Sequence, residues 1–343
     1  MNIMTTSHNN NKFSIIAETA FSHEGNFEYL IKLTDAAKKS KSDYIKYQIV
    51  LNRDNTYSKY YPFYTNIEQW SLSEDEWSRI LIYANTLKLK VIVLPVDCDA
   101  LEFCFKKELL INGLEIHSVC FNEIPFLEKI ALYKKDIFLG IGGRLPNEIS
   151  FVKETLKSKH STLILMFGFQ SFPTNKQFIN LSKIPIYQST FKSKVGYADH
   201  TAYDDPNNHE LSKYAFLLGC NYIEKHLVLK KGKKRVDYEA GIQWEDFIAL
   251  REELDKLNVI LGSNNIFKLN PLEKKYRNRE KKIVAIKNIK KNEILTSKNI
   301  SYKVTDEKSS FQQMDYKRLL GKQVKKSIQK DFPLTSDHVS LYS

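Results

Sequence analysis

Short apolar, β-branched runs alternate along the chain with longer stretches in which apolar residues recur every three to four positions. The first pattern is typical of buried strands, and the second is typical of amphipathic helices. Strands are predicted at residues 14–17, 44–48, 91–95, 114–118, 137–140, 163–167, 195–198 and 222–225. Helices are predicted at residues 29–40, 74–87, 100–110, 123–132, 147–156, 209–218 and 244–261.

Eight predicted strands with helical stretches between them predict an α/β fold of the (β/α)8 kind, the TIM barrel. In this fold the chemistry takes place at the carboxyl ends of the strands. A doubly wound sheet is the alternative, but no GxGxxG motif opens the first helix.

Two segments depart from the alternation. Residues 51–72 form a long, tyrosine-rich connection after the second strand, and we expect either a lid over the barrel mouth or a surface loop without a role. Residues 263–282 are polar and charged, with Pro271, and are typical of a linker. The predicted organisation is therefore a barrel at 1–262, a linker at 263–282 and a small, mostly β module at 283–343.

Composition restricts the class of protein. The chain has 343 residues, of which 42% are hydrophobic, enough for one large core and a small second one. Residues 1–12 are polar, and no later stretch approaches the roughly 20 apolar residues of a membrane span. We expect a soluble, cytoplasmic protein without membrane contact. Its four cysteines lack CxxC spacing and are predicted to be free thiols (Cys98, Cys104, Cys120 and Cys220).

The positive charge is concentrated near the C-terminus. From Ser263 onward there are 19 Lys and Arg against 8 Asp and Glu, a net of +11, so only +1 of the total +12 belongs to the first 262 residues. No aromatic-basic RNA motif or helix-turn-helix pattern accompanies these lysines, and a nucleic-acid partner is not expected. The interpretation is a solvated lysine surface, with a polyanion or acidic substrate as the alternative partner.

Two histidines follow neighbouring predicted strands. His200 lies just after the seventh strand, and His226 lies at the end of the eighth. Neutral imidazoles bind Mn, Zn or Fe, and adjacent strands bring their carboxyl ends together. The two residues therefore predict a divalent-metal site at the barrel mouth.

Seven short stretches, in order along the chain, resemble the sialic acid synthase (NeuB) family. They are IIAE at 15–18, HEGN at 23–26, DYIKYQ at 43–48, FPT at 172–174, GYADHT at 196–201, IEKH at 223–226 and VDY at 236–238. Residues 283–299, with LGK at 320–322, are similar to the antifreeze-like (SAF, β-clip) domain that follows the barrel in this family.

The resemblance implies a reaction. Such enzymes condense phosphoenolpyruvate with an N-acetylmannosamine-type sugar to a nonulosonic acid, release phosphate and use a divalent metal, typically Mn²⁺. On this template His200 and His226 are the metal ligands, and the catalytic residues are Glu18, Lys46 and Glu224. Glu18 orients the sugar or a metal-bound water, Lys46 contacts the phosphate, and Glu224 holds sugar hydroxyls or supports the histidines.

The same template implies substrate contacts and an assembly. Gln48 lies beside the sugar, Ser118 donates to phosphoenolpyruvate, and the remaining substrate-binding candidates are Gln170, Asp199 and Asp237. The small domain of one subunit would cap the barrel of another in a domain-swapped homodimer. The arginine that family members extend toward the partner's site falls near residues 303–305, where none is present.

The chain also departs from the family at positions that serve phosphoenolpyruvate. Glu115 stands where a strand-four lysine is common, Cys120 replaces an acidic residue, and Ala198 replaces a serine. Residues 93–97 read VLPVD in place of an STPFD-type motif. An anion in place of a cation beside a phosphate weakens binding, and His117, Lys192 or Lys194 are the candidates for replacement charge.

Three functions therefore remain open. The first is a diverged synthase of a sialic-acid-like nonulosonate. The second keeps the barrel and the metal but carries out another carbon-carbon chemistry on an anionic sugar. The third is a non-catalytic protein whose basic C-terminal region binds a polyanion.

Overall fold

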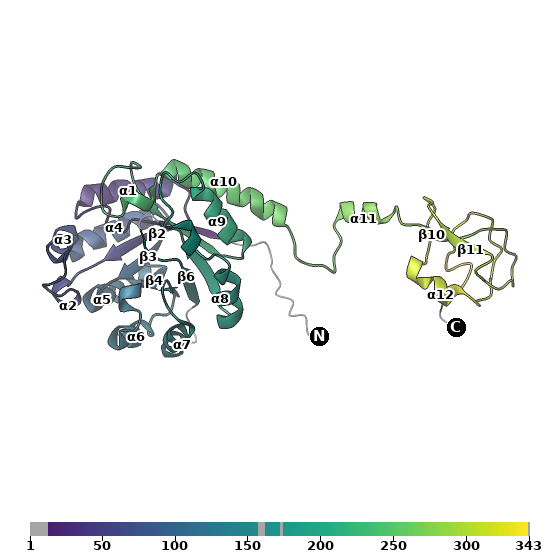
Figure 1. Cartoon of the computed structure of the whole chain (residues 1–343), viewed down its shortest axis with the longest axis horizontal. Helices are drawn as coiled ribbons and strands as arrows, with labels where there is room; N and C mark the ends of the chain where they lie inside the picture. Colours follow the sequence, from purple (N-terminus) through teal and green to yellow (C-terminus); the bar gives the residue numbers. More distant parts are fainter. Residues whose placement is uncertain (1–12, 157–161, 172–173, 342–343) are drawn as a thin grey trace. The chain divides into compact units, whose positions relative to one another are not determined.

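The computed structural model describes residues 13–156, 162–171 and 174–341. Phe172 and Pro173 of the predicted FPT motif lie outside the described residues. The chain divides into two compact units, Met1–Ser263 and Asn264–Ser343 (Figure 1).

The first unit is a closed barrel of eight parallel strands. Each strand pairs with the next, and β1 pairs with β8 to close the ring. The strands are β1 Ser14–Glu18, β2 Tyr44–Ile49, β3 Lys90–Pro95, β4 Gly113–Ile116, β5 Asp136–Gly140, β6 Leu163–Phe167, β7 Lys194–Ala198 and β8 Tyr222–Leu227. A two-residue strand, β9 Gly241–Ile242, pairs in parallel with the last two residues of β8. The predicted TIM barrel is confirmed, and every predicted strand overlaps an observed one.

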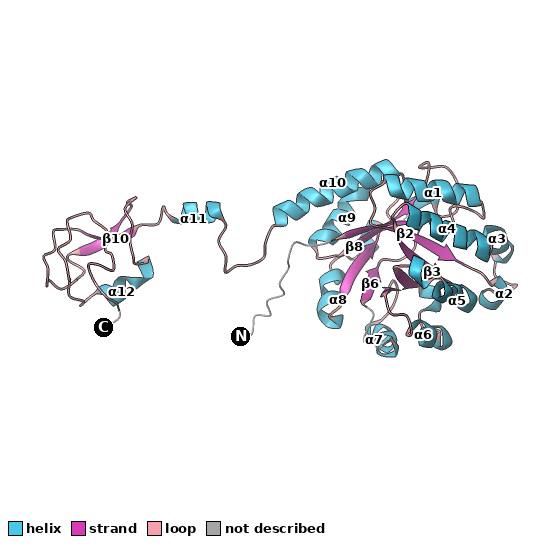
Figure 2. Ribbon diagram, turned by 180° about the vertical axis from the view of Figure 1, so that it is seen from behind, coloured by secondary structure: helices cyan, strands magenta, loops and turns pink. Residues whose placement is uncertain are grey.

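Helices surround the barrel on its outside (Figure 2). They are α1 Phe27–Lys39, α4 Glu74–Thr86, α5 Cys98–Lys106, α6 Ile124–Ile130, α7 Pro146–Thr155, α8 Lys183–Phe191, α9 Asn208–Leu217 and α10 Trp244–Leu261. The prediction at 244–261 matches α10 residue for residue. The sequence analysis missed α8, because Pro185 interrupts its first turn and its apolar residues do not gather on one helical face.

Residues 51–72 are not an unstructured loop. They contain two short helices, α2 Arg53–Thr56 and α3 Tyr64–Trp70. Asn52 accepts a hydrogen bond from the Asn55 amide and caps α2, and the aromatic side chains stack in pairs, Tyr57 on Tyr61 and Phe63 on Trp70. The segment is thus a compact, aromatic layer beside the mouth.

Strand alternation decides which side chains enter the barrel. Successive residues of a strand point to opposite faces, so Tyr44, Lys46 and Gln48 share the inner face of β2, as Tyr222, Glu224 and His226 share that of β8. Near the amino ends, apolar side chains close the interior with one cluster (Ile16, Tyr44, Ile92, Phe138, Ile164, Met166 and Tyr222). The charged side chains of Lys46, Glu115 and Glu224 line a cavity beyond this cluster, toward the carboxyl ends of the strands.

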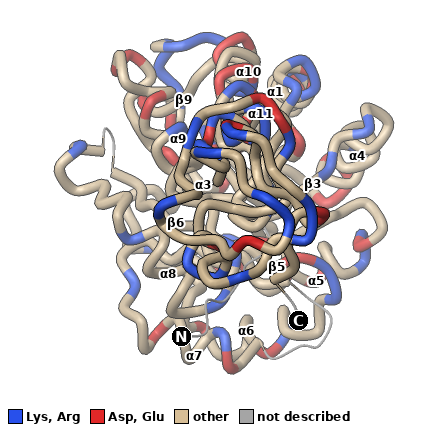
Figure 3. Tube along the Cα trace, turned by 90° about the vertical axis from the view of Figure 1, so that its right-hand side faces the viewer, with Lys and Arg blue, Asp and Glu red and all other residues tan. Residues whose placement is uncertain are grey.

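The C-terminal unit has a small apolar core of its own, which includes Ile283, Ile289, Leu295, Val324 and Leu334. Its regular elements are an antiparallel pair, β10 Lys282–Ala285 and β11 Ile300–Lys303, and the helical turn α12 Tyr316–Leu319. Isolated β-bridges connect its remaining loops. Basic positions recur along this unit, as the sequence indicates (Figure 3).

The predicted linker contains a helix, α11 Pro271–Arg277. Asn270 accepts hydrogen bonds from the amides of Leu272 and Glu273, and the Glu273 carboxylate accepts one from the Asn270 amide. This capping box, with Pro271 at the first helical position, explains why a polar stretch without an apolar face is helical.

All four cysteines are free, as predicted. Among the described residues, no helix is both long and apolar enough to cross a membrane.

Candidate active site

A cavity of about 370 Å³ opens at the carboxyl ends of the barrel strands. Nine of the ten predicted site residues line it: Glu18, Lys46, Gln48, Ser118, Gln170, His200, Glu224, His226 and Asp237. They come from β1, β2 and β8 and from the loops after β4, β6, β7 and β8. The barrel therefore brings together side chains that are as many as 219 positions apart (Glu18 and Asp237).

A single ammonium lies at the centre of the buried charges. Lys46 Nζ is 2.7 Å from Glu115 Oε2, 2.8 Å from Glu224 Oε1 and 3.1 Å from Glu18 Oε1. The Lys46 side chain is 2% exposed, and the three carboxylates are almost as well buried. Lys46 therefore lies in the cavity as predicted, but carboxylates already surround its charge.

The four groups shift one another's protonation. Burial alone would lower the pKa of Lys46, but the carboxylates of Glu115, Glu18 and Glu224 hold it well above its ordinary value. Burial would likewise raise the pKa of Glu18, but Lys46 and His226 bring it well below the usual range. For Glu115 and Glu224 burial is the stronger effect, and both pKa values are raised although Lys46 opposes this.

The two predicted metal ligands face each other across neighbouring strand ends. The ring centroids of His200 and His226 are 5.1 Å apart. Burial, with repulsion from His226, lowers the pKa of His200 to about 3, so this imidazole is neutral at pH 7. Burial would also lower the pKa of His226, but Glu18 Oε2, 3.2 Å from His226 Nε2, raises it.

This donor set suits a divalent transition metal. Two imidazoles, one of them neutral, with a carboxylate in contact with the other, are ligand types that Mn, Fe and Zn accept. Within residues 13–156, 162–171 and 174–341, no group of three or more His, Cys, Asp or Glu side chains has an arrangement that could hold a metal ion. A metal at this mouth would have two protein ligands, His200 and His226, and would take its remaining ligands from water or substrate.

A second, larger chamber of about 810 Å³ adjoins the first. The two share Gln48, His117, Val119, Gln170 and Asp237 as lining residues. Four aromatic side chains of the 51–72 segment line the second chamber: Tyr57, Tyr61, Phe63 and Trp70. Phe21, Lys234 and Arg235 line it as well. The segment expected as a lid or a plain loop therefore forms a wall beside the mouth.

Gln170 and Asp237 lie at the junction of the two chambers. Gln170 Nε2 donates to Asp237 Oδ1 at 3.0 Å. Burial is the main cause that raises the pKa of the Asp237 carboxyl. Asp237 has a left-handed backbone, with φ of +61°, a conformation that costs a non-glycine residue free energy. The pair presents an amide and a carboxyl where both chambers meet.

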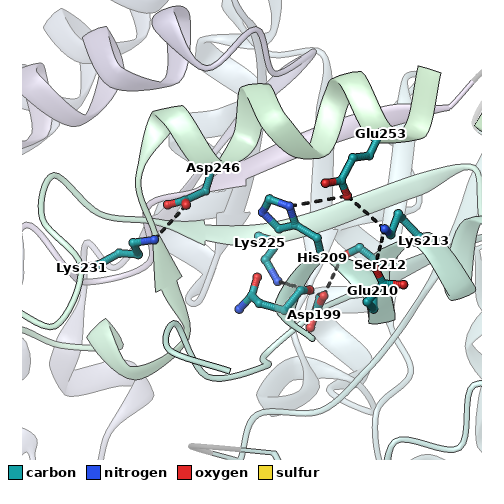
Figure 4. A network of polar contacts seen from close by, with 10 residues as sticks. Asp199, His209, Glu210, Ser212, Lys213, Lys225, Lys231, Asp246 and Glu253 are labelled. Carbon is teal, nitrogen blue, oxygen red and sulfur yellow. Dashed lines mark hydrogen bonds and ion pairs between the residues drawn. The ribbon is translucent and has the colours of Figure 1, made fainter. Parts of the chain in front are cut away.

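Asp199 was predicted to bind substrate, but the structure does not place it in the cavity. Its side chain is fully buried outside the cavity and accepts from Lys225 Nζ at 2.9 Å and from the Ser212 hydroxyl at 2.6 Å. Figure 4 shows this network between the barrel and helices α9 and α10. Burial would raise the pKa of Asp199, but Lys225, Ser212 and Thr201 lower it. The Asp199 carboxylate therefore binds Lys225 and Ser212 outside the cavity and is not among the residues that line it.

None of the three candidates for replacement charge supplies a cation to the cavity. His117 lines the cavity, but burial and the nearby Lys46 lower its pKa to about 4, so it is neutral at pH 7. Lys194 begins β7 and therefore lies at the amino end of the barrel, and Lys192 precedes it. Neither lines the cavity, in which Lys46 is the one Lys or Arg among the described lining residues.

The sequence analysis noted Glu115 as a departure but did not place it beside Lys46. The alternation of Gly113 and Glu115 with apolar Leu114 and Ile116 on β4 predicts that Glu115 points into the barrel, but it does not predict which residue Glu115 meets there. An inward charge needs a counter-ion in a dry interior, and in the structure Lys46 is that counter-ion.

A closed (β/α)8 barrel with a polar cavity and two facing imidazoles at its mouth defines an enzyme-type site at the usual end of this fold. The sequence model of the NeuB family matches residues 33–266, which is more than half of the chain. The chain belongs to the NeuB family.

Individual relatives agree with this membership. The N,N'-diacetyllegionaminic acid synthase of Campylobacter jejuni is 26% identical over 93% of this chain and 98% of its own length. A pseudaminic acid synthase of the same species is 27% identical over 93% and 94%. The fold is also that of the spore coat polysaccharide biosynthesis protein E of Chromobacterium violaceum, with a TM-score of 0.79, 19% identity and 95% and 99% coverage. Since both Campylobacter jejuni relatives are named synthases, the chain is an enzyme of a synthase family.

Replacing Lys225 with Met should destabilise the barrel by about 3–5 kcal/mol, because the Asp199 carboxylate would stay buried without its counter-ion. The free energy of urea unfolding measures the effect. Lys213→Met is the matched control: Lys213 pairs with Glu210 and Glu253 nearer the surface, and its loss should cost about 1 kcal/mol or less. Equal losses in both variants would contradict the structural role of Lys225.

Stability should also fall in mildly acidic solution. His23 is buried and His117 is half-buried. Desolvation is the main cause that lowers the pKa of each to about 4, and the unfolded value is about 6.5. Unfolding therefore takes up protons below about pH 6.5. Each histidine's contribution to the free energy of unfolding is fully present above about pH 6.5 and is lost as the pH falls toward 4. At pH 5 the loss is about 2 kcal/mol for each histidine.

Urea unfolding between pH 7 and 5 in metal-free buffer measures this dependence. His23→Asn, which keeps an acceptor for the Gly25 amide, should reduce the loss of unfolding free energy at pH 5 by about 2 kcal/mol. A pH dependence unchanged in this variant would contradict the assignment to His23.

Proposed function

We propose that the chain is a metal-dependent synthase that condenses phosphoenolpyruvate with an N-acetylmannosamine-type sugar, gives a nonulosonic acid and releases phosphate. The observation that carries the proposal is the shared cavity: Lys46, Ser118, Gln48 and the two histidines line one space at the active end of a NeuB-family barrel. The names of the relatives as legionaminic and pseudaminic acid synthases support a product of this class.

The polar groups suggest a division of labour. Lys46 and Ser118 would bind the donor, while Gln48, Gln170 and Asp237 would hold hydroxyl and N-acyl groups of the sugar, since they lie where the two chambers meet. A divalent metal, Mn²⁺ by the family resemblance, would supply a Lewis acid for the sugar aldehyde when bound by His200 and His226. Glu18, ionised beside His226, would orient the aldehyde or accept a proton from water. Glu224 would hold Lys46 in place through their ion pair.

The aromatic chamber suits the acceptor. Aromatic rings bind the apolar faces of sugars and N-acyl groups, and Lys234 and Arg235 add positive charge to the rim of the same space. The cavity beneath is smaller and more polar, as a compact donor requires.

One observation favours a second candidate function. Glu115 gives the cavity a further carboxylate where a phosphate would bind, so an enzyme that keeps the barrel and the metal but uses a donor without phosphate is the alternative. It predicts sugar turnover in the presence of metal but no phosphate release.

For the C-terminal unit we keep the SAF-type domain and the domain-swapped homodimer as parts of the proposal. The support is a separately folded unit with a small antiparallel sheet and its own core. Mass measurement in solution tests the dimer, and a monomeric mass at all concentrations would remove it. A cytoplasmic location remains part of the same proposal.

The function is tested by incubating the full chain with Mn²⁺, phosphoenolpyruvate and a panel of N-acetylated hexosamines. We expect sugar-dependent phosphate release and a product whose mass equals the sum of pyruvate and the hexosamine. His200→Ala and His226→Ala should each lower the rate at least about 100-fold, because each removes a metal ligand. His209→Ala, which lies outside the cavity beside Glu253, is the matched control and should keep the rate.

Sugar turnover without phosphate release would replace the proposal by the alternative. Wild-type rates in His200→Ala would exclude the metal site.

The acceptor subsite has its own prediction. Trp70→Ala should raise the KM for the N-acetylated sugar about five- to tenfold, because it removes an aromatic surface from the chamber, while the KM for phosphoenolpyruvate stays the same. Tyr60→Ala is the control, since Tyr60 is almost fully exposed in the same segment and does not line the chamber. Equal changes in both KM values would mean that Trp70 supports the barrel mouth as a whole.

A further inference from the structure

The electrostatics of the catalytic cavity are unusual for a site that binds a phosphorylated donor. Four carboxylates line it, from Glu18, Glu115, Glu224 and Asp237, against one Lys and no Arg among the described lining residues. Phosphoenolpyruvate carries a phosphate and a carboxylate, and both repel these groups. The cavity therefore needs an account of how an anionic donor binds.

Lys46 has little capacity left for a phosphate. An ammonium has three N–H donors, and three carboxylate oxygens already lie within 3.1 Å of Nζ. Two of these contacts, with Glu115 and Glu224, are hydrogen bonds of 2.7 and 2.8 Å. A phosphate oxygen can bind Lys46 only by displacing one of the three.

The three carboxylates do not have equal roles. Glu18 also contacts His226, and Glu224 is on the same inner face of β8 as that histidine, two residues before it. Glu115 comes from β4, on the side of the cavity where Ser118 begins the following loop. The second oxygen of Glu115, Oε1, lies 3.9 Å from the point where a Cβ on Gly140 would stand. Gly140 belongs to β5 and also lines the cavity. Glu115 is therefore the carboxylate on the donor side of Lys46.

We propose that Glu115 is a specificity-determining residue that sets the affinity of the barrel for its phosphorylated donor, because its carboxylate occupies Lys46 and repels the phosphate. The inference rests on the proposed function, since it concerns the donor of that reaction. With Glu115 in place, a phosphate binds weakly unless other positive charge enters with it. Without the Glu115 charge, Lys46 becomes a phosphate-binding cation.

Two substitutions separate charge from shape. Glu115→Gln keeps the size and the hydrogen-bonding oxygen but removes the charge, and Glu18 and Glu224 remain to neutralise Lys46. Glu115→Lys places a second cation on β4. Glu102→Gln makes the same change of charge on the outer helix α5, where Glu102 pairs with Lys129 and does not line the cavity.

The test measures binding of phosphoenolpyruvate and of inorganic phosphate to the full, metal-free chain by isothermal titration calorimetry. For charges several ångströms apart at an effective dielectric constant of about 20, Glu115→Gln should tighten binding roughly tenfold or more, and Glu115→Lys roughly a hundredfold. Glu102→Gln should bind as the wild type does. Far-UV circular dichroism confirms that each variant is folded.

Affinities of Glu115→Gln within twofold of the wild type would overturn the inference. So would an equal gain in Glu102→Gln, because the effect would then come from net charge and not from the Lys46 contact. The measurement needs no turnover, so it is distinct from the test of the proposed function. Tighter binding in Glu115→Gln with no condensation in any variant would support the role of Glu115 and overturn the condensation.

Discussion

The barrel mouth depends on one buried ion cluster, the Lys46 ammonium among the carboxylates of Glu18, Glu115 and Glu224. Three carboxylates could not be buried together without a cation, because desolvation and mutual repulsion would force them to take up protons. Lys46 keeps Glu18 ionised, and Glu18 in turn raises the pKa of His226. The charge state of one metal-ligand candidate is thus connected through a single carboxylate to the ammonium on β2.

Much of the fold and of the candidate site could be predicted because both follow from local rules. Eight β-branched runs with intervening amphipathic stretches indicate a barrel, and strand alternation then places Lys46 and Gln48 on one inner face and Glu224 and His226 on another. Closure of the barrel pairs Glu18 with His226 in register. Contact across the barrel is different: Lys46 and Glu115 are 69 residues apart, and no local pattern relates them.

The failed predictions share a physical cause, since each depends on the surroundings of a residue rather than on its own sequence. Asp199 follows β7 in the same motif as His200. Its carboxylate nevertheless lies outside the cavity, because it binds Lys225 on the outer face of β8 and Ser212 on α9. The helices α8 and α11 have no clear apolar stripe. Proline within the first turn of α8 and a capping box at α11 explain their geometry, but neither signal is strong without the rest of the fold.

The contact of Glu115 with Lys46 matters both for the fold and for the proposed binding of a phosphate. The Glu115 carboxylate on the inner face of β4 contacts the Lys46 ammonium and forms a buried ion pair with it. A lysine at position 115 would instead place two cations beside the carboxylates of Glu18 and Glu224. The Lys46 contact therefore offsets part of the cost of burying the Glu115 carboxylate, whose pKa burial still raises, and by the same contact it would oppose a phosphate. Under the proposed function, the Glu115 carboxylate and the phosphate of the donor would therefore compete for Lys46, whereas neither Glu115 nor Lys46 is among the described residues that line the proposed acceptor chamber.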